Sequence, residues 1–287
     1  MAKAHVIGEG LSKCSRWTPR GRRGQHAETQ LFWPGDPEWT ALRRDTDFYS
    51  EDALIWLEAD TIIRQQSGGR RSLDDFCRAF FGGMNSAPIE KTYTRDDLIA
   101  ALTQVAPHDW NQFFQTHIYE LAPRAPLLGI ENSGWTLIYD ANVNETEQDE
   151  HSVNLIYSLG MVVQQTEREK EGAIVDVVPD MPAADAGIAP GMKLLAVNDR
   201  PWSPKALLEA VGKSEAGVGI ELQIDNDGFV RTYEVQYGGG LRFPHLVRDS
   251  SRSEMLSDIL RAHYQPDVKV HHGEDRDRGM QVHERAC

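Results

Sequence analysis

The chain has 287 residues, enough for two domains with packed cores, and its mean hydropathy of −0.49 with 26% charged residues is typical of a soluble protein. The formal net charge of −14 is repelled by phosphate backbones and anionic lipid, so we expect neither nucleic acid nor a membrane as a partner. No segment approaches the ~20 apolar residues that span a bilayer, and residues 1–10 lack the apolar core of a secretion signal, so the compartment stays unknown, with the cytoplasm as the default.

Residues 1–44 show no lasting hydrophobic period and are expected to be irregular, whereas residues 45–121 predict a helical domain. Its first helix is expected to be capped by Ser50 and to end at Gly68 and Gly69. The apolar residues of this helix occupy more than one face, which predicts that it is mostly buried.

Two further helices begin at capping-box patterns, Ser72 with Asp75 and Thr94 with Asp97. A fourth helix is predicted from about Asp109 to Tyr119. It is expected to turn apolar side chains inward, namely those of Trp110, Phe113, Phe114 and Ile118.

After residue 121 the pattern changes to short alternating runs, first in a linker and strand segment over residues 122–153. Strands are then predicted at 160–165, 173–178, 193–197, 220–224 and 230–235, with a helix at 204–211. Residues 238–262 are expected to pack on the core as a C-terminal extension, and residues 263–287 to form a disordered tail. The predicted fold class is α+β and multi-domain: an all-α helical domain followed by a small, partly open β-barrel with one or two helices at 154–237.

The segment 182–192, Pro-Ala-Ala-Asp-Ala-Gly-Ile-Ala-Pro-Gly-Met, leads into the strand that ends at Val197-Asn198. Together with Ser158-Leu159-Gly160-Met161, it resembles the PDZ domains of bacterial proteins over about 80 residues. One departure is Met192-Lys193, where an acidic residue usually follows the glycine.

The PDZ resemblance implies that a peptide adds as a strand between the strand at 162–165 and the helix at 204–211. The Gly160 turn would receive the C-terminal carboxylate. The peptide-binding residues implied are Ser158, Leu159, Gly160, Met161, Val162, Leu207 and Val211. The alternative is that the groove is filled by the chain's own residues, so that the domain only packs.

The sequence from Asp47 to Asp60, followed by Gly68-Gly69 and by Ser72 to Phe76, resembles the region after the metal site in the glycyl aminopeptidase family of zinc peptidases, which belongs to the thermolysin-like clan. Members of this family also carry a C-terminal PDZ domain, and the resemblance covers residues 30–262. It implies that Tyr49 donates a hydrogen bond to the developing oxyanion. The alternative role for Tyr49 is a packing tyrosine at a helix start. Asp52 stands where related sequences have glycine.

The zinc-binding motif HExxH of that family is absent from the sequence, and no Cys-x-x-Cys pair replaces it. We therefore expect no metal site and no cofactor in this chain, although the intact family uses zinc. The expected function is that of a C-terminal fragment of a zinc metallo-aminopeptidase, inactive alone. Its expected partners are peptides or protein C-termini and a separate catalytic half. The alternatives are a stand-alone PDZ adaptor and a complete enzyme with an unrecognised site.

Overall fold

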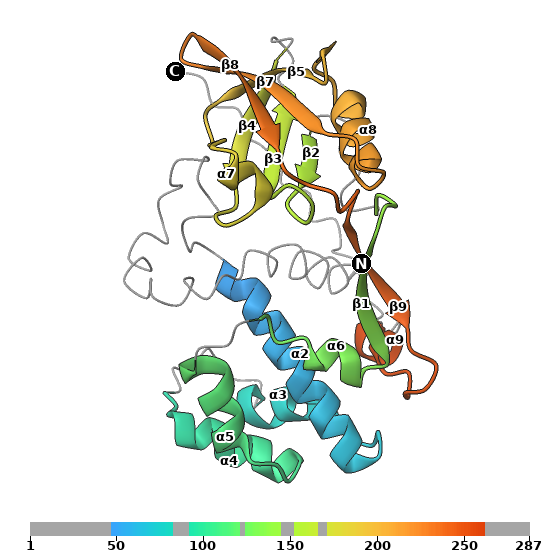
Figure 1. Ribbon diagram of the computed structural model, residues 1–287. Helices are drawn as coiled ribbons and strands as arrows, with labels where there is room; N and C mark the ends of the chain where they lie inside the picture. The colour runs from blue at the N-terminus through green and yellow to red at the C-terminus, as the bar shows by residue number, and fades with distance from the viewer. Residues whose placement is uncertain (1–46, 83–91, 121–123, 145–151, 166–170, 262–287) are drawn as a thin grey trace, which may run out of the picture.

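The computed structural model describes residues 47–82, 92–120, 124–144, 152–165 and 171–261. Helices gather at one end, an antiparallel sheet lies at the other, and a two-stranded ribbon runs between them (Figure 1). The mixed helix and sheet content that the sequence predicts is confirmed. The predicted irregular segment at 1–44 and the tail at 263–287 lie outside the described residues.

The long helix α2 (Asp47–Ser67) carries the helical part of the chain. Ser50 lies inside this helix with its side chain buried, so the prediction that it caps the helix is wrong; the helix already includes the three residues before it. The predicted end is confirmed, because Gly68 and Gly69 adopt φ of +62° and +78°, a left-handed conformation that favours glycine.

Helices α3 (Leu73–Phe81) and α4 (Arg95–Val105) begin where their capping boxes predict. The backbone N–H groups of Ser72 and Thr94 each donate to the carboxylate three residues ahead, Asp75 and Asp97, at 2.8 Å. Local side-chain chemistry therefore sets both helix starts.

The fourth helix is α5 (Trp110–Phe114), capped by Asp109, and it continues as the π-helical turn η4 (Gln115–Tyr119). Trp110, Phe113 and Phe114 are buried, as predicted. Ile118 is 50% exposed, so its predicted inward position is wrong. The wider π-turn adds a residue to the helical repeat and rotates Ile118 away from the core.

The main sheet is antiparallel, with strand order β2-β3-β4-β5-β7-β8 and the short β6 beside β5. Its strands are β2 (Ser152–Leu155), β3 (Met161–Gln165), β4 (Gly172–Val177), β5 (Lys193–Val197), β6 (Arg200–Pro201), β7 (Ile220–Asn226) and β8 (Phe229–Val235). Helices α7 (Pro182–Asp185) and α8 (Pro204–Ser214) complete this part. Among the described strands β2 and β8 end the path without pairing to each other, so the sheet is open and does not close into a barrel.

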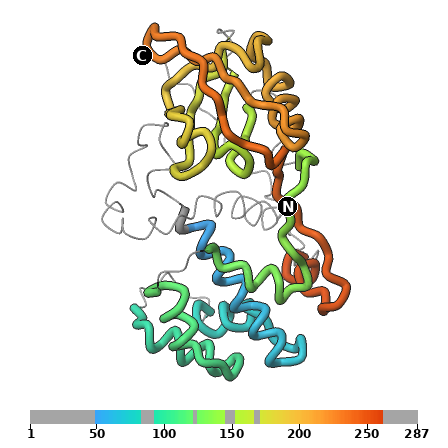
Figure 2. Tube along the Cα trace, viewed as in Figure 1, coloured from blue at the N-terminus to red at the C-terminus, as the bar shows by residue number. Residues whose placement is uncertain are grey.

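The segment before the main sheet and the segment after it pair with each other in a two-stranded antiparallel ribbon. Its strands are β1 (Trp135–Asp140) and β9 (Phe243–Arg248). The tube in Figure 2 shows these two segments running together toward the helical end. Helices α6 (Leu128–Asn132) and α9 (Leu256–Leu260) flank the ribbon. A small core joins α2, α6 and α9 through Leu54, Leu57, Ile130 and Leu256.

Two larger cores lie on either side of this junction. An aromatic-rich core forms among α2, α3, α4 and α5, and a second core lies under the main sheet. The domain boundaries expected from the sequence remain a prediction. Among the described residues, no helix is long and apolar enough to cross a membrane.

Candidate functional site

Tyr49 lies in the first turn of α2, and its side chain is 66% exposed. A tyrosine that only packs at a helix start would bury most of its ring. The exposed ring also lies at the end of α2 that carries the positive pole of the helix dipole. Most of the Tyr49 surface is therefore exposed to solvent at the start of α2.

Asp52 follows Tyr49 by three residues on the same helix. Asp52 is exposed as a residue, but partial desolvation of its carboxyl raises its pKa, and the neighbouring carboxylate of Glu51 raises it further. Asp52 thus carries a carboxyl group whose ionised form is disfavoured in the fold.

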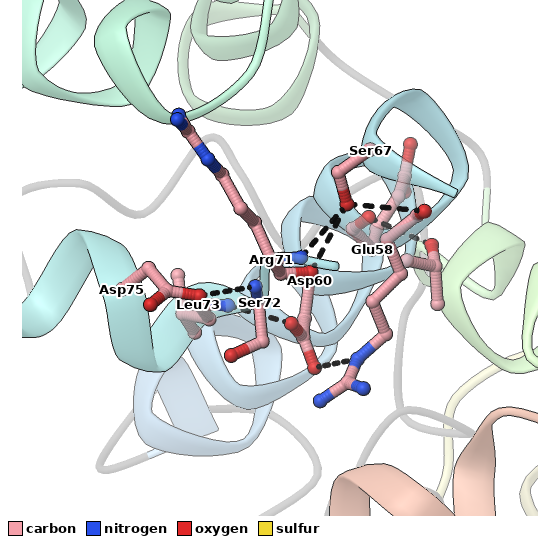
Figure 3. Close-up of polar contacts among 9 residues, drawn as sticks. Glu58, Asp60, Ser67, Arg71, Ser72, Leu73 and Asp75 are labelled. Atoms are coloured by element: carbon pink, nitrogen blue, oxygen red, sulfur yellow. Dashed lines mark hydrogen bonds and ion pairs between the residues drawn. The ribbon is translucent and has the colours of Figure 1, made fainter. Parts of the chain in front are cut away.

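A polar network fixes the middle of α2 to the helices around it, as Figure 3 shows. The Asp60 carboxylate pairs with Arg64 at 3.0 Å and accepts from the backbone N–H of Leu73 at 2.7 Å. Arg71 donates to the backbone carbonyls of Gln104 and Val105 at 2.8 and 2.9 Å. These groups hold α3 and α4 against α2, so we assign them a structural role.

Glu58 and His117 form a buried pair that the sequence does not predict, with 3.2 Å between Glu58 Oε1 and His117 Nε2. The second carboxylate oxygen, Oε2, has no hydrogen-bond partner among the described residues. His117 reaches Glu58 from the π-turn η4, which turns its side chain toward α2. The only signal in the sequence is a histidine and a glutamate 59 positions apart.

A zinc ion does not fit the residues that the structure describes. Within them, no group of three or more histidine, cysteine, aspartate or glutamate side chains is arranged to hold a metal. Glu58 and His117 supply one carboxylate and one imidazole, fewer than the three protein ligands of a catalytic zinc site. The described part of the chain therefore does not form a catalytic zinc site by itself.

The PDZ resemblance assigns the loop at 156–160 to binding of a peptide carboxylate. In this loop two backbone N–H groups point at the same oxygen atom. The N–H groups of Ser158 and Gly160 both donate to the carbonyl oxygen of Leu155, at 3.0 and 2.9 Å. Gly160 has φ of +76°, the left-handed conformation that allows the two N–H groups to point at one oxygen.

The predicted peptide-binding side chains lie mostly in the core of the sheet. Leu159, Met161, Leu207 and Val211 are fully buried in the core cluster under the sheet. Val162 is half-buried on β3. The structure thus brings the predicted residues together, with these aliphatic side chains packed on one another.

The edge of β3 that is predicted to accept a peptide is paired with β2. Val153 lies opposite Val163 and Leu155 opposite Met161 in an antiparallel register. Figure 1 shows β2 between β3 and α8, and α8 packs against β2. The sequence does not predict β2, because its four residues are too short for an alternating pattern to stand out.

Ser158 is buried and joins the loop to the segment after the sheet. Its hydroxyl oxygen accepts from the backbone N–H of Arg242 at 3.1 Å. Nearby, the phenol of Tyr237 donates to the carbonyl oxygen of Gly240 at 2.8 Å, and burial raises the pKa of this phenol. The contact with Arg242 assigns Ser158 a structural role in the described fold.

No protein-family model matches the sequence, and no curated protein is detectably similar to it. The structure is similar to the crystal structure of an aminopeptidase N family protein from Idiomarina loihiensis, with a TM-score of 0.55 and 16% sequence identity. The similarity covers 85% of this chain and 42% of that protein, so the chain spans less than half the length of the structure it matches. At this identity the likeness is one of fold.

Proposed function

We propose that this chain forms the helical layer and a PDZ-like module of a zinc aminopeptidase related to the glycyl aminopeptidase family, and that it is not catalytic alone. The observation that carries the proposal is the shared arrangement of helical part and sheet over 85% of the chain. A coverage this large includes residues of both parts. The zinc site of such an enzyme would lie outside these 287 residues, because this sequence contains no HExxH motif.

In this proposal Tyr49 is the residue that the chain contributes to the active site. Its phenol would donate a hydrogen bond to the oxygen that becomes negatively charged as a peptide bond is attacked. Its high exposure at the start of α2 supports this role. The reaction class is hydrolysis of an N-terminal peptide bond, with glycyl or alanyl substrates expected from the family resemblance.

The purified 287-residue chain should first be assayed on glycyl and alanyl anilides, with and without a zinc chelator. We expect no turnover in either condition. Chelator-sensitive turnover by the chain alone would contradict the proposal, because it would require a metal site within this sequence.

A second assay tests Tyr49 directly. The chain is mixed with a polypeptide that carries the HExxH region of a glycyl aminopeptidase family enzyme, and activity is measured for the wild type and for Tyr49→Phe. We expect the variant to lose about 10²–10³-fold in kcat, as on loss of one oxyanion donor, while still binding the other polypeptide. Tyr93→Phe and Tyr119→Phe are matched controls, since both rings are similarly exposed on the helical part, and neither should change kcat. Equal activity of Tyr49→Phe and the controls would remove the role of Tyr49.

A second candidate function is peptide binding by a stand-alone PDZ adaptor. It is supported by the two N–H groups of Ser158 and Gly160 that converge on one oxygen. A screen of immobilised C-terminal peptides tests it. Selective binding of peptides with an aliphatic last residue is expected, and uniform signal across all peptides would remove this candidate.

A further inference from the structure

The strand β2 has the position and contacts of a bound peptide. It runs antiparallel to β3, with Ser152 opposite Gln164 and Leu155 opposite Met161. Extended peptides that bind at a sheet edge use this geometry, with ladder hydrogen bonds to the edge strand and alternate side chains in pockets. The side chains of Val153 and Leu155 alternate inward and are buried in the core.

The C-terminal end of β2 also resembles the end of a bound peptide. The Leu155 carbonyl oxygen accepts from the N–H groups of both Ser158 and Gly160. Two converging N–H groups beside a left-handed glycine form a backbone nest that binds an anionic oxygen more strongly than a neutral carbonyl. A peptide ending in a free carboxylate would therefore satisfy this loop better than Leu155 does.

We propose that Ser152–Leu155 is an internal peptide ligand of the sheet, so that β3 accepts an external peptide only when this segment is displaced. The external partner is an extended peptide with a free carboxylate and an aliphatic last residue that replaces Leu155. This inference rests on the proposed peptide-binding role of the sheet and deepens it, because it states what holds the site closed.

The helix α8 shows why displacement is required. It packs against β2 as well as β5 and β7, so β2 fills the space between β3 and the helix. A peptide on β3 would occupy that same space. Internal and external strands are thus mutually exclusive, and the apparent affinity for a peptide falls by the fraction of molecules in which β2 is bound.

The test measures binding of a fluorescently labelled peptide with the sequence of residues 148–155 and a free C-terminal carboxylate. Wild type is compared with Leu155→Ala, which weakens the internal strand. The matched control is Leu222→Ala, because Leu222 is equally buried in the same core but lies on β7. We expect Leu155→Ala to bind at least 10-fold more tightly than wild type, and Leu222→Ala to bind like wild type. The C-terminal amide form of the peptide should bind about 10-fold more weakly to Leu155→Ala.

The outcomes separate two kinds of failure. If wild type binds as tightly as Leu155→Ala, the internal ligand is ruled out while the peptide-binding role stands. If neither binds, both the inference and the adaptor function are overturned. Equal gains in Leu155→Ala and Leu222→Ala would also overturn the inference, since general loosening of the core would explain them. If Leu155→Ala fails to fold, Val153→Ala takes its place, because it removes less buried volume from the same strand. Its peptide affinity is compared with that of wild type in the same way.

Discussion

Asp52 and Gly160 show how single residues limit what this fold tolerates. The folded environment of Asp52 disfavours the ionised form of its carboxyl group. Gly160 adopts a backbone conformation that other residues rarely adopt. Both lie close to a proposed functional group. Asp52 is near Tyr49, and Gly160 donates to the carbonyl oxygen of Leu155 at the end of β2. Their effects on stability can be measured without any substrate.

Asp52→Asn is expected to raise stability at neutral pH. The pKa of the folded-state carboxyl is raised, mainly by burial and then by Glu51, so the protonated form favours folding. That contribution is fully present below the ordinary pKa of 3.8 and is lost as pH rises through the higher folded-state value. Thermal unfolding at pH 7 should therefore show a higher Tm for the variant, and the difference should vanish below pH 3.8.

The control for this prediction is Asp249→Asn, which should act in the opposite direction. Hydrogen bonds from the side chain and backbone of Ser251 lower the pKa of Asp249. Its contribution is present above the ordinary pKa and is lost as pH falls through the lower folded-state value. A gain in Tm for both variants at pH 7 would contradict the assignment.

Gly160→Ala is expected to destabilise the sheet by about 1–3 kcal/mol or more. The added Cβ would lie 2.3 Å from Cβ of Met181, and the backbone φ is +76°. Gly217→Ala separates the two causes, because Gly217 has φ of +81° with nothing within 4 Å of the added atom. Urea unfolding of both variants should show the larger loss for Gly160→Ala, and equal losses would mean that the contact with Met181 adds nothing.

Among the elements, α6 crosses α2 at a distance that requires a glycine. A Cβ on Gly129 would lie 2.5 Å from the backbone nitrogen of Glu58. This close approach holds α6 beside the part of α2 that carries the Glu58–His117 pair. The crossing thus couples the helical core to the ribbon of β1 and β9.

Gly129→Ala is expected to lower the free energy of unfolding by about 1–3 kcal/mol, because backbone atoms of α2 would have to move. This loss should appear although alanine favours helices by about 1 kcal/mol over glycine. Gly212→Ala in α8 is the matched control, since its added Cβ meets only Leu241, with Cδ1 at 3.7 Å, an ordinary contact. Chemical denaturation should show Gly212→Ala unchanged or more stable. A neutral Gly129→Ala would show that α6 does not depend on the close crossing.

Across the whole molecule, the ribbon connects the two ends of the described chain. β1 precedes the main sheet and β9 follows it, so the sheet is inserted between two strands that pair with each other. The side chains of Leu246 and Leu256 reach the core that also contains Leu54 of α2. The segment that follows the sheet therefore packs against the helical part and stabilises it.

A chain ending at Arg242 should lose stability in its helical part. It would lack β9 and α9 and would expose the apolar surface of Leu54, Leu57 and Ile130. Burying one such side chain stabilises by about 1.5–3 kcal/mol, so we expect a loss of at least about 2 kcal/mol and increased binding of a hydrophobic dye. Hydrogen exchange should show the loss in α2 and α6, while β4 and β7 keep their protection. Unchanged exchange in α2 would mean that the ribbon is not needed by the helices.

Elements that depend on neighbouring residues follow from the amino-acid sequence alone. The starts of α3 and α4 follow from Ser72–Asp75 and Thr94–Asp97, and the end of α2 follows from Gly68 and Gly69. The strands β3, β4, β5, β7 and β8 are predictable from the pattern within each strand. These signals act over a few residues, so they can be recognised without knowing the fold.

Features that depend on distant partners become visible only in the folded chain. β2, β9 and α6 have weak local signals, and each is held by residues far away in the chain. The same applies to the exposure of Tyr49, the pairing of Glu58 with His117 and the occupant of the β3 edge. The physical reason is that burial and strand pairing depend on which distant residues pack around a segment. The same local pattern is compatible with several tertiary arrangements, so it does not select one of them.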